Sequence, residues 1–432
     1  MIRRVACITL LGSALAAAQT APLTIDLPDA LARARKYGLQ LDSATLAVRQ
    51  ATEDRKQAKA NTLPQVTANN GFLITQGNGS PTGSYVTANG VHVYTEQVQA
   101  HEELLNAVRK GEIRRALAAE MTAKARVEVA SRGLTTVVIQ DYYSVLAAQR
   151  HLLNAQKSVT EAERFYDISS KQEKGGEVAH SDVIKAQLLL QQRQRDVQDA
   201  QLAIVKAKIA IAVLMFPEVR EDFDLADDLA AAPKDLPVPA DVSAQAVSTS
   251  PEIKTAASVV NEATHGITIA KYGYLPSFGL DFWYGFNSNQ LTWYTTIDKE
   301  KFRNPGYQAQ ATLNIPLWTW GSIRSRVKQA SLKEEQAKID LTLAQRNVKA
   351  NVLAAYQELR VAQDQLKSLQ ESATLSQESL RLTVLRYQAG EASALEVSDA
   401  QSTLTQARNA YDDGLVRYRV ASATLQTLTG NL

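Results

Sequence analysis

PSFGLDFWYGF, residues Pro276 to Phe286, alternates between two kinds of side chain. Successive side chains of a β-strand point to opposite faces. One face carries Phe278, Leu280, Phe282, Tyr284 and Phe286, and the other carries Ser277, Gly279, Asp281, Trp283 and Gly285. The pattern predicts a strand of about ten residues, the length that crosses a bilayer when the strand is tilted. An aromatic face of this kind needs a cover, either a protein core or lipid.

Three further segments complete two predicted strand pairs. GYQAQATLNIP, residues 306–316, again places apolar side chains on one face and polar ones on the other. In the first half of the chain, Val66, Ala68, Phe72 and Ile74 alternate with polar residues. Their partner strand, around residues 91–105, alternates poorly. The connection at residues 287–306 is polar and long for a hairpin turn.

The tryptophans gather around the second strand pair. Tryptophan collects where lipid meets water, and all four lie in or beside this pair: Trp283, Trp293, Trp318 and Trp320. The alternative is a soluble sandwich with an aromatic core. Four short strands cannot close a membrane barrel alone, because about eight is the usual minimum. A barrel would therefore need strands from several chains.

The chain repeats itself. AKANTLPQV (residues 58–66) matches AKYGYLPSF (residues 270–278), and GEIR (residues 111–114) matches GSIR (residues 321–324). Seven residues between Gly176 and Gln192 recur at the same spacing between Gly390 and Gln406. Matches in the same order indicate a tandem duplication. We therefore predict a first repeat at residues 19–216, an acidic, proline-rich linker with one short helix at residues 217–252, and a second repeat at residues 253–432.

Two very long helices are predicted, from Gly111 to about Gln172 and from Gly321 to Tyr387. The second run contains no proline, and a helix of this length would extend roughly 100 Å. One of its seams has the heptad spacing of a coiled coil: Leu359, Ala362, Leu366, Leu369, Ala373, Ser376, Leu380, Thr383 and Tyr387. An ordinary coiled-coil rod is the alternative interpretation of this seam.

The N-terminus has the layout of a secretory signal peptide at residues 1–18, with Arg3 and Arg4, an apolar stretch and three alanines. The only cysteine, Cys7, lies within it, so the mature chain suits an exported protein without disulfides. Beyond residue 18 no run of about 18 apolar residues predicts a membrane-spanning helix. Arg3 and Arg4 account for the net charge of +2, so no basic excess indicates nucleic-acid binding.

No motif points to an enzyme, a cofactor or a metal site. The five histidines show no metal-ligand spacing: His92, His101, His151, His180 and His265. The glycines between Gly77 and Gly83 do not fit a phosphate-binding or dinucleotide-binding loop. No nucleophile motif occurs. We therefore expect a protein without catalytic activity.

The chain resembles the TolC family of outer-membrane efflux proteins. The resemblance rests on the duplicated plan, on Leu63-Pro64 and Leu275-Pro276 before strands, on PLWTWG at residues 316–321, and on RYQAGEASALEVSDAQSTLTQARNAY at residues 386–411. It covers essentially the whole mature chain. It implies a mixed, mainly α fold in a homotrimer. Each chain would contribute four strands to a shared transmembrane β-barrel in the outer membrane, and long antiparallel coiled-coil helices would form a periplasmic α-barrel.

In such a barrel the aromatic row that begins at Phe278 would face outer-membrane lipid. Gly279, Asp281 and Gly285 would then face the lumen. The resemblance also implies an entrance at two helix–turn–helix tips, at residues 174–183 and 387–399, which opens when a periplasmic adaptor docks. Gly176 and Gly390 are expected to form the two turns, because glycine accepts positive φ at little cost.

The resemblance assigns further roles at the entrance. Glu396 and Asp399 match acidic rings at the constriction, and Tyr387 and Asp182 match a pair that holds the entrance shut. Ala392 stands where the family has a basic residue of the same network. Glu396 is equally well explained as half of a capping box with Ser393, and Asp182 as a first-turn acid that the helix dipole favours.

These observations predict the outer-membrane exit duct of a tripartite efflux or type I secretion system. Passage would be passive, with the energy supplied by an inner-membrane pump or transporter. One alternative is an exported coiled-coil scaffold or adhesin without a pore, which leaves the two strand pairs and the clustered tryptophans unexplained. A second is the periplasmic adaptor, which has one helical hairpin and small β-domains where this chain has two hairpins.

Overall fold

The computed structural model describes residues 23–74, 92–229, 238–288, 291–297 and 299–430. The predicted signal peptide with Cys7 and the glycine-containing loop at residues 77–83 lie outside these ranges. Within them, no helix is both long and apolar enough to cross a membrane. The chain forms two compact units. Unit 1 comprises residues 1–38, 135–234 and 361–421, and unit 2 comprises residues 39–134, 235–360 and 422–432.

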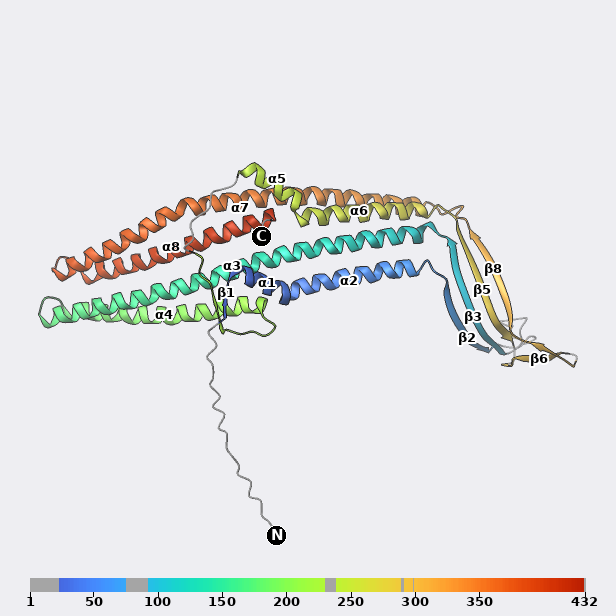
Figure 1. The fold of residues 1–432 in the computed structure, drawn as a ribbon, viewed down its shortest axis with the longest axis horizontal. Helices are drawn as coiled ribbons and strands as arrows, with labels where there is room; N and C mark the ends of the chain where they lie inside the picture. Colours follow the sequence, from blue (N-terminus) through green and yellow to red (C-terminus); the bar gives the residue numbers. More distant parts are fainter. Residues whose placement is uncertain (1–22, 75–91, 230–237, 289–290, 298, 431–432) are drawn as a thin grey trace, which may run out of the picture. The chain divides into compact units, whose positions relative to one another are not determined.

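The main elements occur twice in the same order (Figure 1). The first set is α2 (Leu39–Ala60), β2 (Gln65–Ile74), β3 (His92–Leu105), α3 (Ala107–Lys174) and α4 (His180–Met215). The second set is α6 (Pro251–Tyr272), β5 (Ser277–Ser288), β8 (Gly306–Asn314), α7 (Ser322–Gln388) and α8 (Ala394–Thr429). The predicted duplication, strand pairs and long helices are therefore confirmed. The helices α3, α7 and α8 contribute to both units.

Six shorter elements complete the fold. The first repeat begins with β1 (Leu23–Ile25) and α1 (Leu27–Tyr37), and the predicted linker holds β4 (Phe223–Leu225) beside its expected helix, α5 (Pro239–Thr249). The strands β1 and β4 pair in parallel. The long connection after β5 contains a hairpin of β6 (Tyr294–Ile297) and β7 (Glu300–Arg303). These strands are not predictable from the sequence pattern, because three or four residues are too few to show a period of two.

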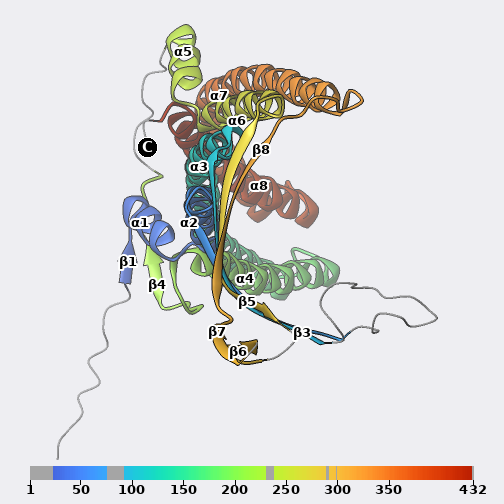
Figure 2. The ribbon, with the colours of Figure 1, turned by 90° about the vertical axis from the view of Figure 1, so that its right-hand side faces the viewer.

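Unit 2 holds a four-stranded antiparallel sheet with the order β2-β3-β5-β8 (Figure 1; Figure 2 shows the sheet turned by 90°). The register places one polar side chain from every strand in a single row: Gln65, His101, Asp281 and Gln310. Paired residues share a face of the sheet, so the alternation of β5 continues across all four strands. The weak alternation of β3 has a specific cause, because Glu96 and Glu102 lie on the apolar face opposite Phe286 and Leu280.

The helices of unit 2 join the sheet through polar contacts. Arg109 of α3 donates from Nη1 to the backbone oxygen of Asn61 at 2.6 Å and pairs through Nε with Glu103 of β3 at 2.9 Å. Its guanidinium thus ties the end of α2 and the end of β3 to the start of α3. Further along the same helices, Arg55 of α2 pairs with Glu120 of α3 at 2.6 Å.

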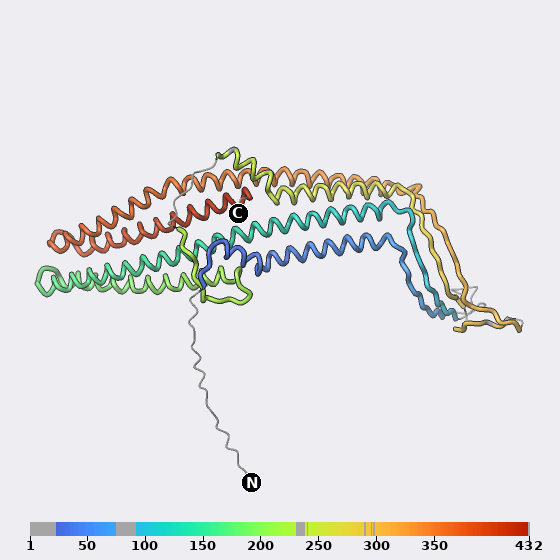
Figure 3. The backbone as a smooth tube through the Cα atoms, viewed as in Figure 1, coloured from blue at the N-terminus to red at the C-terminus, as the bar shows by residue number. Residues whose placement is uncertain are grey.

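Unit 1 consists mainly of two helical hairpins, α3 with α4 and α7 with α8 (Figure 3). Every residue of the predicted heptad seam on α7 is buried or half-buried, which confirms the coiled-coil spacing. Gly414 of α8 allows close approach to α7, since a Cβ atom there would lie 2.6 Å from the Leu369 side chain. Polar contacts join α3 to α8, including Asn154 Nδ2 to Asp412 Oδ2 at 2.7 Å.

Candidate functional site

The two hairpin tips of unit 1 have the same backbone geometry. Gly176 follows α3 with φ +78°, and Gly390 follows α7 with φ +76°. At the second tip, Glu391 N–H donates to Arg386 O at 2.9 Å and Gly390 N–H to Tyr387 O at 3.1 Å. The first tip has the equivalent pair of bonds. Both glycines therefore occupy the left-handed position of a Schellman motif, as the sequence predicts for these turns.

Tyr387 is the centre of the packing between the tips. Its side chain is only 1% exposed, its hydroxyl donates to Ser169 Oγ on α3 at 3.0 Å, and its ring meets that of Phe165 edge-on at 5.1 Å. Gln172 of α3 donates from Nε2 to the backbone oxygens of Tyr387 and Gln388, at 3.4 and 3.2 Å. The C-terminal end of α7 is thus held by three side chains of α3.

We expect Tyr387→Phe to lower the free energy of unfolding by about 1 to 3 kcal/mol, because it leaves the buried Ser169 hydroxyl without its partner. The double variant Tyr387→Phe, Ser169→Ala should lose less than Tyr387→Phe alone, since neither hydroxyl then remains buried and unpaired. Denaturant unfolding of the detergent-solubilised protein measures both values. Additive losses would show that the two hydroxyls act independently.

The structure does not bring Asp182 to Tyr387. Asp182 lies in the first turn of α4 and pairs with Lys185 one turn further along, at 3.1 Å. Ala392 is partly buried against an apolar cluster of the tips that includes Phe165, Tyr387 and Val397. A basic side chain at position 392 would have to leave this apolar environment or bury its charge. The contacts of Tyr387 and Ala392 at the tips are therefore neutral.

Glu396 forms the capping box that the sequence predicts as one of two alternatives. Its Oε1 accepts from the backbone N–H of Ser393 at 3.1 Å, and its own N–H donates to Ser393 Oγ at 3.3 Å. Arg386 lies 3.6 Å from its other carboxylate oxygen. The hydrogen bonds from Ser393, with a smaller contribution from Arg386, lower the pKa of the Glu396 carboxyl below its ordinary value. Glu396 therefore remains charged at neutral pH.

Asp399, one turn further along α8, is exposed. Within the described ranges its carboxylate takes part in no hydrogen bond or ion pair, unlike that of Glu396. Three further residues at these tips are not predicted from the sequence: Ser169, Gln172 and Arg386. Their hydrogen-bonding side chains give no periodic signal, and only the packing of helices distant in sequence brings them together.

The apolar face of the sheet in unit 2 is largely uncovered. Leu280, Phe282 and Tyr284 are 40%, 46% and 53% exposed. Phe286, at the end of this row, is only 8% exposed and meets the Trp293 ring edge-on at 6.3 Å. Phe278 is half-buried. Four of the five predicted lipid-facing residues thus retain exposed surface in one chain, and the fifth is covered by a predicted interface tryptophan.

Two tryptophans project from the turn between β8 and α7. Trp318 is 74% exposed and Trp320 is 89% exposed, and their rings meet edge-on at 5.6 Å. Trp320 has φ +50°, which costs a residue with a side chain about 1 to 3 kcal/mol. Trp293 is also exposed, whereas Trp283 is half-buried on the polar face of β5. The turn therefore holds two large apolar rings in the solvent at a conformational cost.

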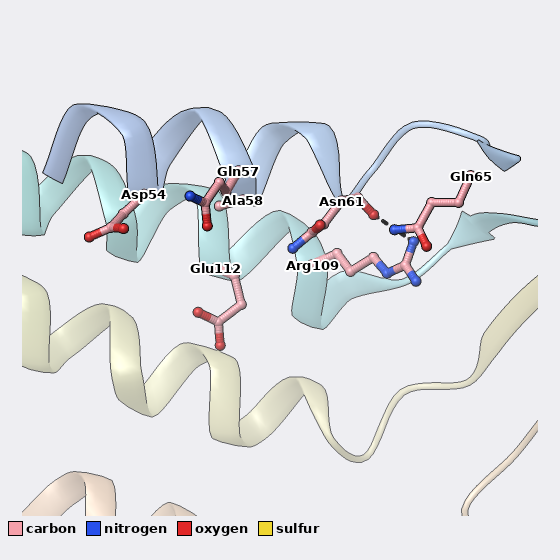
Figure 4. Close-up of a pocket in the computed structure, with 7 residues that line it drawn as sticks. All are labelled: Asp54, Gln57, Ala58, Asn61, Gln65, Arg109 and Glu112. Carbon is pink, nitrogen blue, oxygen red and sulfur yellow. Dashed lines mark hydrogen bonds between the residues drawn. The ribbon is translucent and has the colours of Figure 1, made fainter. Parts of the chain in front are cut away.

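No feature of the described residues resembles a catalytic or metal centre. They contain no group of three or more His, Cys, Asp and Glu side chains able to hold a metal ion. A pocket of about 510 Å³ in unit 2 is lined mainly by polar residues of α2 and α3, such as Asp54, Gln57 and Glu112 (Figure 4). Arg109 borders it, but its guanidinium is held by Asn61 and Glu103.

The sheet with two unlike faces, the paired long hairpins and the repeated glycine turns define the fold of an outer-membrane efflux channel. Residues 30–215 and 242–431 match the family model described as outer membrane efflux protein, and the chain belongs to this family. It is 21% identical to the outer membrane protein TolC of Vibrio cholerae over 400 residues, covering 93% of this chain and 89% of that protein. It is 24% identical to the outer membrane efflux protein BepC of Brucella suis over 434 residues, covering 95% and 87%.

Among solved structures, the CmeC outer membrane channel of Campylobacter jejuni has the same fold. It superposes with a TM-score of 0.79 at 16% identity, covering 94% of this chain and 85% of that one. The predicted membership of the TolC-like family and the predicted fold class are confirmed.

Proposed function

We propose that this protein is the outer-membrane exit duct of a tripartite efflux or type I secretion system. The observation that carries the proposal is the four-stranded sheet, which is polar on one face and has an exposed apolar face on the other. Four strands cannot close a barrel, whereas three copies supply twelve. The apolar face then meets lipid and the row of Gln65, His101, Asp281 and Gln310 lines the lumen. Family membership supports the same function.

The chain divides, in this proposal, into a signal peptide at residues 1–18, two repeats at residues 19–216 and 253–432, and a linker at residues 217–252. The sheet lies in the outer membrane, and the helical hairpins extend into the periplasm. Trp318 and Trp320 lie where lipid meets water. The duct has no catalytic activity, and an inner-membrane pump supplies the energy.

The hairpin tips form the periplasmic entrance and the docking surface for an adaptor, with turns at Gly176 and Gly390. Tyr387 and Asp182 belong to the contacts that hold the entrance closed. In one chain Tyr387 bonds to Ser169 of α3, whereas Asp182 pairs with Lys185 of its own helix and would act on the other tips in the trimer. Asp399 and Glu396 form two acidic rings in the trimer. Three carboxylates around one axis concentrate negative potential and favour cations. Asp399 is the stronger candidate for binding a passing cation, because the Glu396 carboxylate already contacts the backbone N–H of Ser393 and the guanidinium of Arg386.

The test is single-channel conductance in a planar bilayer, with a divalent cation added on one side. We expect discrete conductance steps that the cation blocks. Asp399→Asn should raise the blocking concentration about tenfold, corresponding to 1.4 kcal/mol of binding. Glu396→Gln should have a smaller effect. Asp364→Asn removes another exposed carboxylate of unit 1 and is the matched control, for which we expect no change.

Each outcome has a distinct meaning. Conductance steps that no cation blocks would support the pore but contradict the acidic constriction. Glu396 and Asp399 would then have structural roles only. Silence from protein shown to be inserted, in the wild type and in all variants, would contradict the pore and favour the exported scaffold.

A further inference from the structure

Glu102 is a carboxylate on the apolar face of the sheet. It pairs with Leu280 of β5, which pairs with Ala311 of β8. The next row on the same face, further from the helices, is also apolar: Ala100, Phe282 and Ala309. Paired side chains of neighbouring strands lie on one face. Glu102 therefore lies beside five apolar residues on this face, of which Leu280 and Phe282 are 40% and 46% exposed.

These residues form a groove. A pocket of about 450 Å³ is lined by Glu102 together with Ala100, Leu280, Phe282, Ala309 and Ala311. Pro64 also lines it, as do His101, Asp281 and Gln310, which belong to the row on the opposite face of the sheet. Alanine side chains on β3 and β8 flank the larger Leu280 and Phe282 of β5, so the surface is hollowed along the strands. The side chains of this face that line the groove are apolar except for Glu102, which lies at the end nearer the helices.

Glu102 is half-buried, and one oxygen of its carboxylate lacks a partner among the described residues. Its Oε2 atom is buried and takes part in no hydrogen bond with any residue that the structure describes. Glu103, the next residue, lies on the polar face and pairs with Arg109 at 2.9 Å. Burying a carboxylate oxygen without a hydrogen bond is costly. Because the residue retains accessible surface, a cationic donor from outside the chain can approach the carboxylate and offset part of that cost.

The position of Glu102 in the strand matches the depth of a lipid head group. It lies three residues before β3 ends at Leu105, which corresponds to about 10 Å along the strand. The exposed rings of Trp318 and Trp320 follow β8 at the same end of the sheet. Tryptophan rings prefer the head-group region, so the carboxylate and the rings lie at compatible depths.

We propose that Glu102 binds the head group of an outer-membrane phospholipid that carries a primary ammonium, with one acyl chain in the groove. The proposal rests on the proposed function, in which this face meets lipid. A primary ammonium offers three N–H donors and a charge opposite to that of the carboxylate. A quaternary ammonium has the charge without the donors, and an anionic head group has neither.

The experiment is lipid competition on the purified full-length channel by native mass spectrometry, with phosphatidylethanolamine, phosphatidylcholine and phosphatidylglycerol as probes. We expect about a tenfold preference for phosphatidylethanolamine, the size of one charge-assisted hydrogen bond. Glu102→Gln should abolish it. Glu96→Gln is the matched control, because Glu96 lies on the same strand and face but pairs with Phe286 near the other end. We expect Glu96→Gln to retain the preference.

A wild-type channel that binds the three lipids equally would overturn the proposal, as would a preference that survives Glu102→Gln. A preference for phosphatidylglycerol that depends on divalent cations and disappears with a chelator would also overturn it, in favour of a metal bridge. Protein that does not insert into lipid vesicles at all would contradict the proposed function instead. Inserted, conducting protein without lipid preference would contradict only the role of Glu102.

Discussion

We expect Gly285→Ala to prevent assembly of the membrane sheet. Gly285 has φ +151°, a conformation that residues with a side chain rarely adopt. A Cβ atom at this position would lie 2.0 Å from the backbone oxygen of Glu96 and 2.7 Å from the Cα atom of Gln97. These are backbone atoms of β3, so no side-chain rotation relieves the overlap. The pairing between β3 and β5, which joins the two repeats in the sheet, must therefore break or shift.

The strain of the φ angle alone costs about 1 to 3 kcal/mol, and the overlap adds to it. A loss of this size is a large fraction of the stability of a typical domain. We therefore expect at least a tenfold decrease in the fraction of heat-resistant oligomers recovered from outer-membrane fractions. The refolding yield of purified protein in detergent should decrease in parallel, which separates a folding defect from a secretion defect.

Gly306→Ala is the matched control for this variant. Gly306 pairs directly with Gly285 across the sheet, yet a Cβ atom there meets nothing within 4 Å. Gly306→Ala should therefore assemble as the wild type does. Equal loss in both variants would mean that the sheet is sensitive to any added side chain at this level, and the close approach of β3 would not be the cause.

The difference between Gly285 and Gly306 shows which features of the sheet the sequence predicts and which it does not. The alternation in β5 predicts its two faces, and the register then assigns the faces of β2, β3 and β8. Neither pattern distinguishes Gly285 from Gly306, because both are simply glycines in strands. The close approach depends on the local path of two strands from different repeats, which only three-dimensional packing determines.

At the candidate entrance, too, some features are predictable from the sequence and others are not. Gly176 and Gly390 are predictable because a helix that reverses direction within a few residues needs a left-handed position. The capping box of Glu396 is predictable from its spacing to Ser393. The partner of Tyr387 is not, because Ser169 lies more than 200 residues away and its identity depends on how α3 is rotated about its axis. The small Ala392 is likewise explained only by its contact with the apolar cluster of the tips.

Gly390→Pro should abolish export and leave the sheet inserted in the outer membrane. Proline fixes φ near −65°, whereas Gly390 has φ +76°. The substitution also removes the N–H that donates to Tyr387 O at 3.1 Å. The turn must then change its path, and α8 begins only four residues later with Ala394 and Val397 in the apolar cluster of the tips. The second tip should therefore lose the proposed adaptor-docking surface.

The measurement combines two readouts in cells that lack the wild-type protein. Accumulation of an exported dye reports export, for which we expect at least a tenfold loss, since a misplaced proline costs about 3 kcal/mol or more. Heat-resistant oligomers in the outer-membrane fraction report assembly and should remain near the wild-type amount, because Gly390 belongs to unit 1 and the sheet to unit 2. Gly390→Asn is the matched control, because asparagine tolerates the left-handed conformation and retains the N–H group. Export that persists in Gly390→Pro, with the oligomer intact, would place the adaptor-binding surface elsewhere on the chain.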